Sequence, residues 1–346
     1  MKPVHKKLFF LFIFCQLTWQ INAQILPAFG GSRTGTTGFQ FLKISPDAYS
    51  SGIAEATIAS ESGINGLFWN PASIAAVDSQ RLHLSINHLS YFAGINMESV
   101  GTVYRLDDDR ALGFSLIYLS SGEMDVTTEF HPFGTGQTFS AVNLAFGVTY
   151  AQFLTDNFNY GLTAKFVQES IAGINTSTAM FDFGFQYDVG ISNLRFAVNL
   201  SNFGFSAKPN GEIPVIGLEE ESTASEFQQI NSPTIFRLGL AYDIIKKEKN
   251  KLTLLGQLNH PTDNNETFNL AAEYNFNNLL YLRTGYQFGQ DEFTYPSAGL
   301  GLKLKRYFGV IDINYAFTAK ERLGQNHRIS FGFAAFKKKN ATENAR

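Results

Sequence analysis

The chain has 346 residues, of which 34 are Phe, 14 are Tyr and 30 are Gly, while only 16% are charged. Despite this aromatic content, its mean hydropathy is close to neutral, at -0.07. A soluble protein this rich in aromatic residues would be more hydrophobic in total, whereas a membrane barrel combines an aromatic outside with a polar inside. The formal net charge of -3 excludes the basic surface that nucleic-acid binding requires, so no nucleic-acid partner is expected.

Residues 1–23 have the pattern of a secretory signal peptide. Three lysines precede the apolar segment 8–15, and Ala23 provides a small residue for cleavage. The apolar segment is too short for a transmembrane helix, which needs about 20 residues. Cys15 follows Phe14, where a lipoprotein signal has a small residue, so lipidation is not expected. Cleavage would leave 24 Lys and Arg (27 minus 3) against 30 Asp and Glu, and no cysteine for disulfides or thiolate metal sites.

Residues 81–336 repeat one pattern, in which alternating apolar and polar residues are followed by a turn. In 179–187, for example, aromatic residues alternate with Met, Asp, Gly and Gln. A period of two gives a strand with two different faces, and tilted strands of roughly 9 to 11 residues span a bilayer. We therefore predict an all-β fold, a 14-stranded antiparallel transmembrane β-barrel. The predicted strands are 82–91, 97–106, 110–121, 139–154, 158–171, 179–189, 194–203, 235–244, 252–260, 267–276, 280–289, 297–306, 310–318 and 328–336.

The connections between these strands fall into two classes that alternate along the chain. The even-numbered connections contain at most seven residues, whereas the odd-numbered ones include 122–139 and the 31-residue external loop 204–234. Bacterial barrels have an even number of strands, short periplasmic turns and longer external loops. The alternation therefore supports the strand count and places the long connections outside the cell.

One face of each predicted strand is apolar, as at Phe114, Leu116 and Tyr118, and is expected to contact lipid. A Lys or Arg on this face near the bilayer centre would cost roughly 2 to 4 kcal/mol. The charged residues of the opposite face must therefore point into the lumen, where they either pack against one another or form a binding site. They are Arg105, Lys165, Glu169, Arg195, Arg237, Glu273, Arg283 and Asp312.

Residues 24–80 do not alternate and are interrupted by Gly and Pro. A fourteen-stranded barrel has an interior too wide for side chains alone to fill, so this segment is expected to form a hatch inside it. The alternative is a free periplasmic domain. Residues 337–346 are a polar tail after an aromatic last strand, and we expect them to be periplasmic.

Motifs in the hatch resemble the PorV/PorQ family of outer-membrane barrels and, more distantly, the fatty-acid transporter FadL. They are the runs 41–48, 52–56 and 66–72, the last of which contains Asn-Pro-Ala, with further matches at 119–129 and 201–204. The sequence departs from the family at Tyr49, where Arg is usual, and at Ile53-Ala54-Glu55. The resemblance implies a hatch motif formed by Pro46, Asp47, Trp69, Asn70, Pro71 and Ala72.

The same resemblance implies a function in the type IX secretion system, at the outer membrane and in contact with its lipid. External loops would bind secreted cargo proteins through their C-terminal sorting domains and carry them from the translocon to an attachment complex. Apolar side chains of the external loop could dock such a partner, or the loop could fold over its own barrel mouth. These side chains are Phe205, Ile213, Val215, Ile216, Leu218 and Phe227, and segment 130–139 is a second candidate.

A FadL-like transporter of hydrophobic small molecules is the alternative function. A continuous apolar tunnel leading to an opening in the barrel wall would favour it. An enzyme is not expected, and neither is a cofactor or a metal. Residues 30–37 have P-loop-like spacing but carry Thr36 in place of the phosphate-binding Lys. His83 and His88 are five residues apart and so point to opposite faces of one strand.

Overall fold

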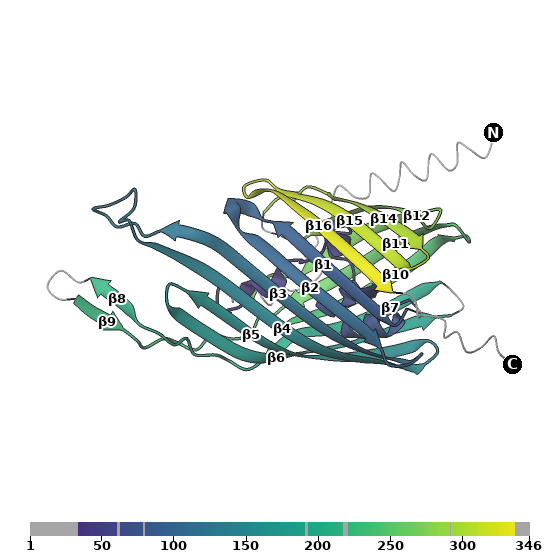
Figure 1. Cartoon of the computed structure of the whole chain (residues 1–346), viewed down its shortest axis with the longest axis horizontal. Helices are drawn as coiled ribbons and strands as arrows, with labels where there is room; N and C mark the ends of the chain where they lie inside the picture. Colours follow the sequence, from purple (N-terminus) through teal and green to yellow (C-terminus); the bar gives the residue numbers. More distant parts are fainter. Residues whose placement is uncertain are drawn as a thin grey trace, which may run out of the picture.

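The computed structural model describes residues 34–60, 63–78, 80–190, 193–216, 221–290 and 292–335. The predicted signal peptide and polar tail lie outside these residues. Within them, fourteen antiparallel strands form a closed barrel in which the first strand pairs with the last, so the predicted fold class is confirmed (Figure 1). None of the helices in the described ranges is long and apolar enough to cross a bilayer.

The predicted strands agree closely with those of the structure. The barrel consists of β1 Leu82–Ser90, β2 Asn96–Arg105, β3 Arg110–Asp125, β4 Thr138–Thr155, β5 Phe158–Ile171, β6 Ile174–Val189, β7 Leu194–Gly204, β10 Ile235–Lys246, β11 Asn250–Pro261, β12 Thr267–Phe276, β13 Leu280–Phe288, β14 Ser297–Arg306, β15 Gly309–Lys320 and β16 Gly324–Ala335. The short helices are η3 Gln40–Lys43, α2 Ala48–Gly52, η4 Gly63–Phe68, η5 Pro71–Ala76 and η6 Phe92–Gly94.

Some strands extend further than the alternation predicted. β6 begins at Ile174, five residues earlier than expected, because a two-residue turn at Ala172 and Gly173 lets Ile174 pair with Ile171. Both turn residues have positive φ, 49° and 87°, and such turns match the right-handed twist of paired strands. The predicted seven-residue connection is therefore a tight hairpin.

The external loop contains a second sheet that the sequence did not indicate. β8 Ile213–Ile216 and β9 Glu221–Ala224 pair only with each other. Their hairpin and the β3–β4 hairpin both project from the same end of the barrel (Figure 1). We name this the external end, because it carries the long connections, and the opposite one the periplasmic end.

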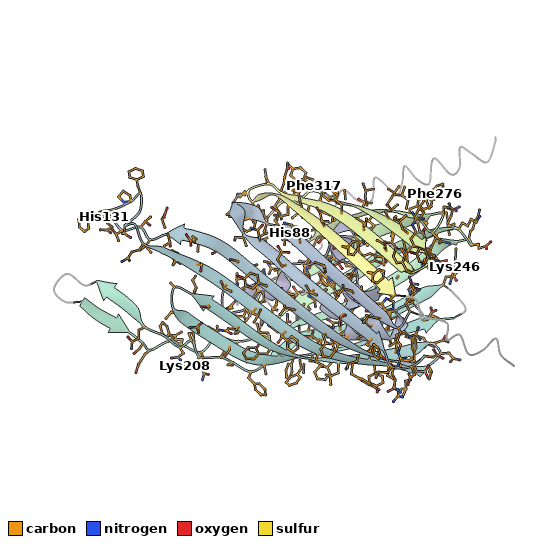
Figure 2. The ribbon with its side chains drawn as sticks, in the orientation of Figure 1. His88, His131, Lys208, Lys246, Phe276 and Phe317 are labelled. Carbon is orange, nitrogen blue, oxygen red and sulfur yellow. The ribbon has the colours of Figure 1, made fainter. Side chains whose placement is uncertain are left out.

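The two faces of the barrel wall differ as predicted. Along β3, Phe114, Leu116 and Tyr118 are exposed on the outer face, while Gly113 and Ser115 of the opposite face are buried. Figure 2 shows side chains over the whole wall, with Lys246 and Phe276 at the periplasmic end and His131 and Lys208 at the external end. Burial thus follows the alternation of the sequence.

Several of the predicted lumen charges pair with one another or with neighbours. The Lys165 ammonium lies 2.7 Å from the Asp182 carboxylate, and the Arg283 guanidinium lies 2.5 Å from the Glu273 carboxylate. Arg237 instead donates to Asn199, at 3.2 Å, and to Ser201. The first two pairs join neighbouring strands, so these charges pack against one another in the wall, which is one of the two roles predicted for the lumen charges. Among the described residues, no carboxylate forms a salt bridge with Arg237, which instead lies over the Trp69 ring.

Candidate functional site

The hatch lies against the inner face of the wall on opposite sides of the lumen. Helix α2 packs on β13, β14, β15 and β16, whereas η5 packs on β3, β4, β5 and β6, and η4 on β1, β2 and β3. In Figure 1, these helices lie among the strands of the barrel. The described part of the hatch thus bridges the barrel interior.

Wall glycines give the hatch room to approach. A Cβ atom at Gly184 would lie 2.0 Å from the Asn70 side-chain oxygen, and one at Gly161 would lie 2.4 Å from the Pro71 carbonyl carbon. Real Cβ atoms do not approach other atoms this closely, so a larger residue at either site would displace the hatch. Glycine therefore occupies these lumen-facing positions because the hatch packs directly against the backbone of the wall there.

Asp47 joins two parts of the hatch motif that are 22 residues apart. Its carboxylate caps the N-terminus of α2 by accepting from the Ser50 amide at 2.8 Å, and it accepts from the Trp69 indole N–H at 2.9 Å. The Arg237 guanidinium lies 5.4 Å from the centre of the Trp69 ring. Burial raises the pKa of the Asp47 carboxyl, and the hydrogen bonds from Ser50 and Trp69 partly oppose this. A wall cation, an indole and a helix cap therefore form one buried group.

The Asn-Pro-Ala run is the second contact between hatch and wall. The Asn70 side-chain oxygen accepts from the Ala72 amide at 3.1 Å, and the Asn70 amide group donates to the Ile58 carbonyl at 3.0 Å. Pro71 occupies the first turn of η5, where a missing N–H costs nothing. From β5, Asn159 donates to the Ala72 carbonyl at 2.8 Å. Pro46, the remaining hatch-motif residue, lines a small cavity beside Trp69.

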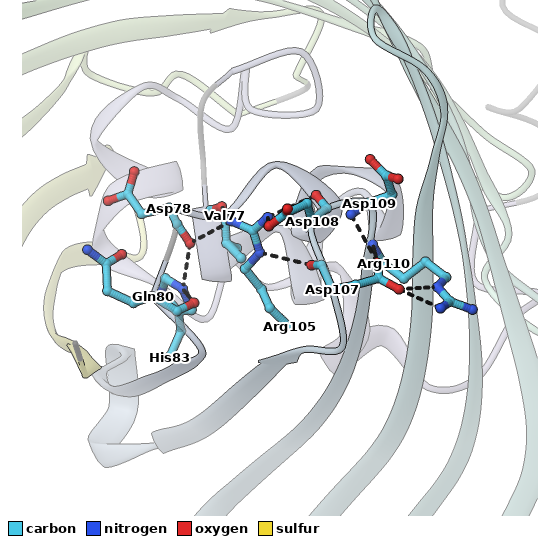
Figure 3. Close-up of polar contacts among 9 residues, drawn as sticks. All are labelled: Val77, Asp78, Gln80, His83, Arg105, Asp107, Asp108, Asp109 and Arg110. Atoms are coloured by element: carbon cyan, nitrogen blue, oxygen red, sulfur yellow. Dashed lines mark hydrogen bonds and ion pairs between the residues drawn. The ribbon is translucent and has the colours of Figure 1, made fainter. Parts of the chain in front are cut away.

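The end of the hatch is tied to the periplasmic end of the wall (Figure 3). Arg105 donates to the Val77 and Asp78 carbonyls, and the His83 ring contacts the Asp78 carbonyl at 3.1 Å. The Asp78 carboxylate lies 3.0 Å from the Lys303 ammonium on β14. Burial would raise the pKa of Asp78, but the attraction and hydrogen bond of Lys303 outweigh it and lower the pKa.

The start of the described hatch is tied to the external end. Thr37, Gln40 and Lys43 all donate to the carboxylate of Asp263, which follows β11, with Gln40 at 2.8 Å. The Gly38 amide donates to the Asn231 carbonyl at 3.0 Å. Burial would raise the pKa of Asp263, but the hydrogen bonds from Lys43, Thr37 and Gln40 outweigh it and lower the pKa. The contact of Asp263 could not be predicted from the sequence, because its partner Lys43 is 220 residues away.

Helix α2 separates two cavities in the lumen. The external cavity has a volume of about 600 Å³ and includes Ser51 of α2 in its lining. The periplasmic cavity has a volume of about 480 Å³ and includes Tyr49 of the same helix. Among the described residues, none lines both cavities.

The described residues among those predicted for partner binding belong to the external loop 204–234. Phe205 is 69% exposed and Phe227 is half-buried. Ile213, Val215 and Ile216 lie in β8, and Leu218 lies outside the described residues. At the β3–β4 tip, Phe130 and Phe133 are 88% and 99% exposed. The two hairpins extend beyond the barrel end instead of covering its mouth (Figure 1).

The comparisons with known proteins agree with this architecture. Residues 29–262, about two-thirds of the chain, match the family model described as type IX secretion system protein PorV. The chain belongs to the PorV family. It is therefore an outer-membrane β-barrel protein of the type IX secretion system. No curated protein sequence matches the chain.

Solved barrel structures share the fold of this PorV-family protein at low sequence identity. The toluene transporter TodX of P. putida has a TM-score of 0.60 and 12% identity, with 84% of this chain and 99% of that chain covered. The Ralstonia pickettii toluene transporter TbuX has a TM-score of 0.55 and 11% identity, covering 88% and 100%. A Pseudomonas aeruginosa FadL homologue has a TM-score of 0.51 and 11% identity, covering 90% and 100%. Such identities establish the FadL-like fold alone.

The family and these structures are described as secretion or transport proteins. Among the residues that the structure describes, no group of three or more His, Cys, Asp or Glu is arranged to hold a metal ion. His83 and His88 lie on opposite faces of β1, the former buried and the latter exposed, as the spacing predicted.

Proposed function

We propose that this PorV-family barrel is a non-enzymatic carrier of the type IX secretion system. Its projecting hairpins would bind the C-terminal sorting domain of secreted cargo and carry it from the translocon to the attachment complex. The observation that carries this proposal is the position of Phe130, Phe133 and Phe205. Phe130 and Phe133 lie between β3 and β4 and are 88% and 99% exposed, and Phe205, one residue after the end of β7, is 69% exposed. Exposed aromatic groups of this kind are typical of docking sites.

The hatch supports the same proposal. A lumen divided by α2 into two separate cavities does not offer a path for a folded protein. Residues 24–80 would then act as a permanent plug, and cargo would be handled on the outer surface. We therefore propose that the barrel anchors the docking surface in the membrane and diffuses with it in the plane of the membrane, from the translocon to the attachment complex.

The test compares matched Phe-to-Ser variants in a strain that lacks the chromosomal gene. We expect the triple variant Phe130→Ser, Phe133→Ser and Phe205→Ser to reduce release of proteins with C-terminal sorting domains to the level of the deletion strain. The control is Tyr307→Ser, since Tyr307 is 94% exposed at the predicted periplasmic end. The amount of barrel in the outer membrane is measured for each strain. Normal secretion and processing with the triple variant would refute the docking surface, and normal secretion in the deletion strain would refute the carrier function.

The second candidate is transport of hydrophobic small molecules, which the external cavity favours. Phe41, Ile44, Phe92, Ile95 and Leu119 form an apolar part of its lining, and its volume lies in the range of about 300–1,000 Å³ typical of ligand sites. The closed ring of strands and the separated cavities mean that transport would require α2 to move. Unchanged uptake of long-chain hydrophobic compounds in the deletion strain would refute this candidate.

A further inference from the structure

The exposed charges at the periplasmic end of the wall fall into two sectors of opposite sign. The turns after β10, β12 and β14 form the basic sector, which has one exposed acid, Glu248, and a net charge of +4 (5 minus 1). Its five exposed cations are Lys246, Lys247, Lys249, Lys305 and Arg306. The turns after β2, β4 and β6 form the acidic sector, in which Arg110 is the one exposed cation among the described residues and the net charge is −4 (1 minus 5). Its exposed carboxylates are Asp107, Asp108, Asp109, Asp156 and Asp188. The two sectors occupy opposite halves of the ring of strands.

The three turns of the basic sector form one continuous surface. The Asn278 amide donates to the Lys249 carbonyl at 3.1 Å, and the Asn278 side chain donates to the Glu248 carbonyl at 2.9 Å. On the other side of the middle turn, the Lys303 amide donates to the Leu279 carbonyl at 2.8 Å. These hydrogen bonds join the first turn to the second and the second to β14. The cations of the outer two turns are therefore held on one rim.

The cations of the basic sector differ from the cations that lie behind them on the lumen side. Lys251 lies 3.5 Å from the Asp243 carboxylate, and Lys303 lies 3.0 Å from the Asp78 carboxylate. Within the described ranges, by contrast, none of the five cations of the basic sector has a carboxylate within 4.0 Å. Like charges gathered without counter-charges repel one another, so an anion that neutralises them is bound favourably.

An apolar outer wall leads directly to these cations. Ile245 is exposed at the end of β10, and Lys247 lies two residues beyond it. Along β14, Leu300 is 51% exposed, and Arg306 continues the same row of alternate residues. Phe276, at the end of β12, is also 51% exposed and lies at the same end of the barrel as Lys246 (Figure 2). Aromatic residues flank the apolar band of a membrane barrel at the level of the lipid headgroups. We therefore expect the cations at the depth of the phosphate groups of the inner leaflet.

We propose that the basic sector binds anionic phospholipids of the inner leaflet. The phosphate group would lie between Lys247 and Arg306, and the acyl chains would lie along the outer wall of β10 to β14. The chemistry is that by which clustered lysines and arginines next to a bilayer select anionic lipids. An acidic periplasmic protein is disfavoured, because the turns are short and the cations adjoin an apolar wall that a soluble partner would not cover.

The position of the basic sector gives the barrel a preferred orientation toward its lipid neighbours. The β3–β4 hairpin, which carries Phe130 and Phe133, is half of the fourteen-strand ring away from β12 and β13, the middle of the basic sector. The acidic sector lies below that hairpin and repels the same lipids. Bound anionic lipid would thus occupy one side of the barrel and leave the hairpin side free. This inference goes beyond the carrier function and does not depend on it.

The test measures which phospholipids the purified full-length barrel retains, by native mass spectrometry with equal amounts of dioleoylphosphatidylglycerol and dioleoylphosphatidylcholine in the detergent. We expect the anionic lipid to be retained at least about fivefold more than the zwitterionic one, which corresponds to roughly 1 kcal/mol. The double variant Lys247→Gln, Arg306→Gln should reduce this preference to less than about twofold. The matched control is Lys208→Gln, Arg322→Gln, which removes one exposed lysine and one exposed arginine at the external end and should leave the preference unchanged.

Two further measurements separate lipid from other anions. Raising ammonium acetate from about 0.05 to 0.5 M should reduce the preference, because exposed charges are screened by salt. Neither glycerol 3-phosphate nor a ten-residue glutamate peptide should displace the bound lipid, since neither has an apolar part for the outer wall. Displacement by glycerol 3-phosphate would mean a site for free phosphate, and displacement by the peptide would mean a site for an acidic protein. Either result, equal retention of the two lipids by the wild type, or an equal loss in the two double variants would overturn the inference.

Discussion

The barrel wall and the hatch are stabilised in different ways. In the wall, each residue pairs with strands beside it, and its environment follows from its parity along the strand, as for Leu116 between Val100 and Phe146. In the hatch, short helices are fixed by side chains from distant strands, such as Asn159 on Ala72 and Asn269 on Ala54. The wall is thus a repeating structure, in which the energetic cost of a substitution on the outer face depends on its contact with lipid. The hatch depends on individual contacts, so single substitutions should release it while the wall stays folded.

The largest effect is expected from a charge on the lipid face of the wall. Leu116→Arg should lower the free energy of unfolding by roughly 2 to 4 kcal/mol, because Leu116 lies midway along β3 on its exposed apolar face, where we expect the bilayer centre. Leu154→Arg is the control at the periplasmic end of β4, where the cost falls to about 0 to 1 kcal/mol. Denaturant unfolding in lipid vesicles measures both. Equal costs would show that depth in the bilayer does not govern the wall.

The next effect concerns the contact between wall and hatch. Gly161→Ala should destabilise the protein by roughly 1 to 3 kcal/mol, because the added Cβ would collide with the Pro71 backbone. Gly256→Ala is the matched control, since the nearest atom to its Cβ is 3.8 Å away. Limited proteolysis at Lys43 should reveal a released hatch in Gly161→Ala alone. If Lys43 stays protected from the protease in this variant, the added Cβ displaces the wall strand and not the hatch.

A smaller effect is expected from the buried carboxylate of the hatch. Asp47→Ala removes the cap of α2, which costs about 0.5 to 2 kcal/mol, and leaves the Trp69 N–H without its acceptor. It also removes a charge whose burial is unfavourable, so the net loss should be near 1 kcal/mol. Cleavage of the predicted signal peptide 1–23 leaves Trp69 as the single tryptophan, and its emission should shift to longer wavelength. Asp47→Asn keeps a cap acceptor and should shift it less, and equal shifts would contradict the capping role.

The smallest effect is expected at the Asp263 contact. The pKa of this carboxyl is lowered in the folded state, so its contribution to stability is present above the unfolded value of about 3.9 and is lost as pH falls through the folded value. Asp263→Asn should therefore speed amide hydrogen exchange in residues 37–44 at pH 7. In the wild type, the same segment should lose its protection only below about pH 4. Unchanged exchange in the variant would show that Gly38 and Asn231 hold this segment alone.

The wall could be predicted because its signal is local. Period-two alternation and the phase of the connections located every barrel strand, and only ends such as that of β6 were wrong, since the two-residue turn at Ala172 and Gly173 lengthens the pairing. The hatch motif was predicted by resemblance, but its contacts were not predicted. No local pattern around Asp47 predicts its hydrogen bond with Trp69, and none around Lys43 predicts its contact with Asp263.

The sequence by itself determined a fourteen-stranded barrel, the residues that face lipid and the residues that face the lumen, because each of these depends on neighbours along one strand. Only the tertiary structure decided what the lumen residues do. Closing the ring brings β10 and β16 to the same cavity, so that Arg237, Arg328 and Glu55 of the hatch all line it. Charges that are far apart in the chain interact across a space that exists only once the barrel has closed.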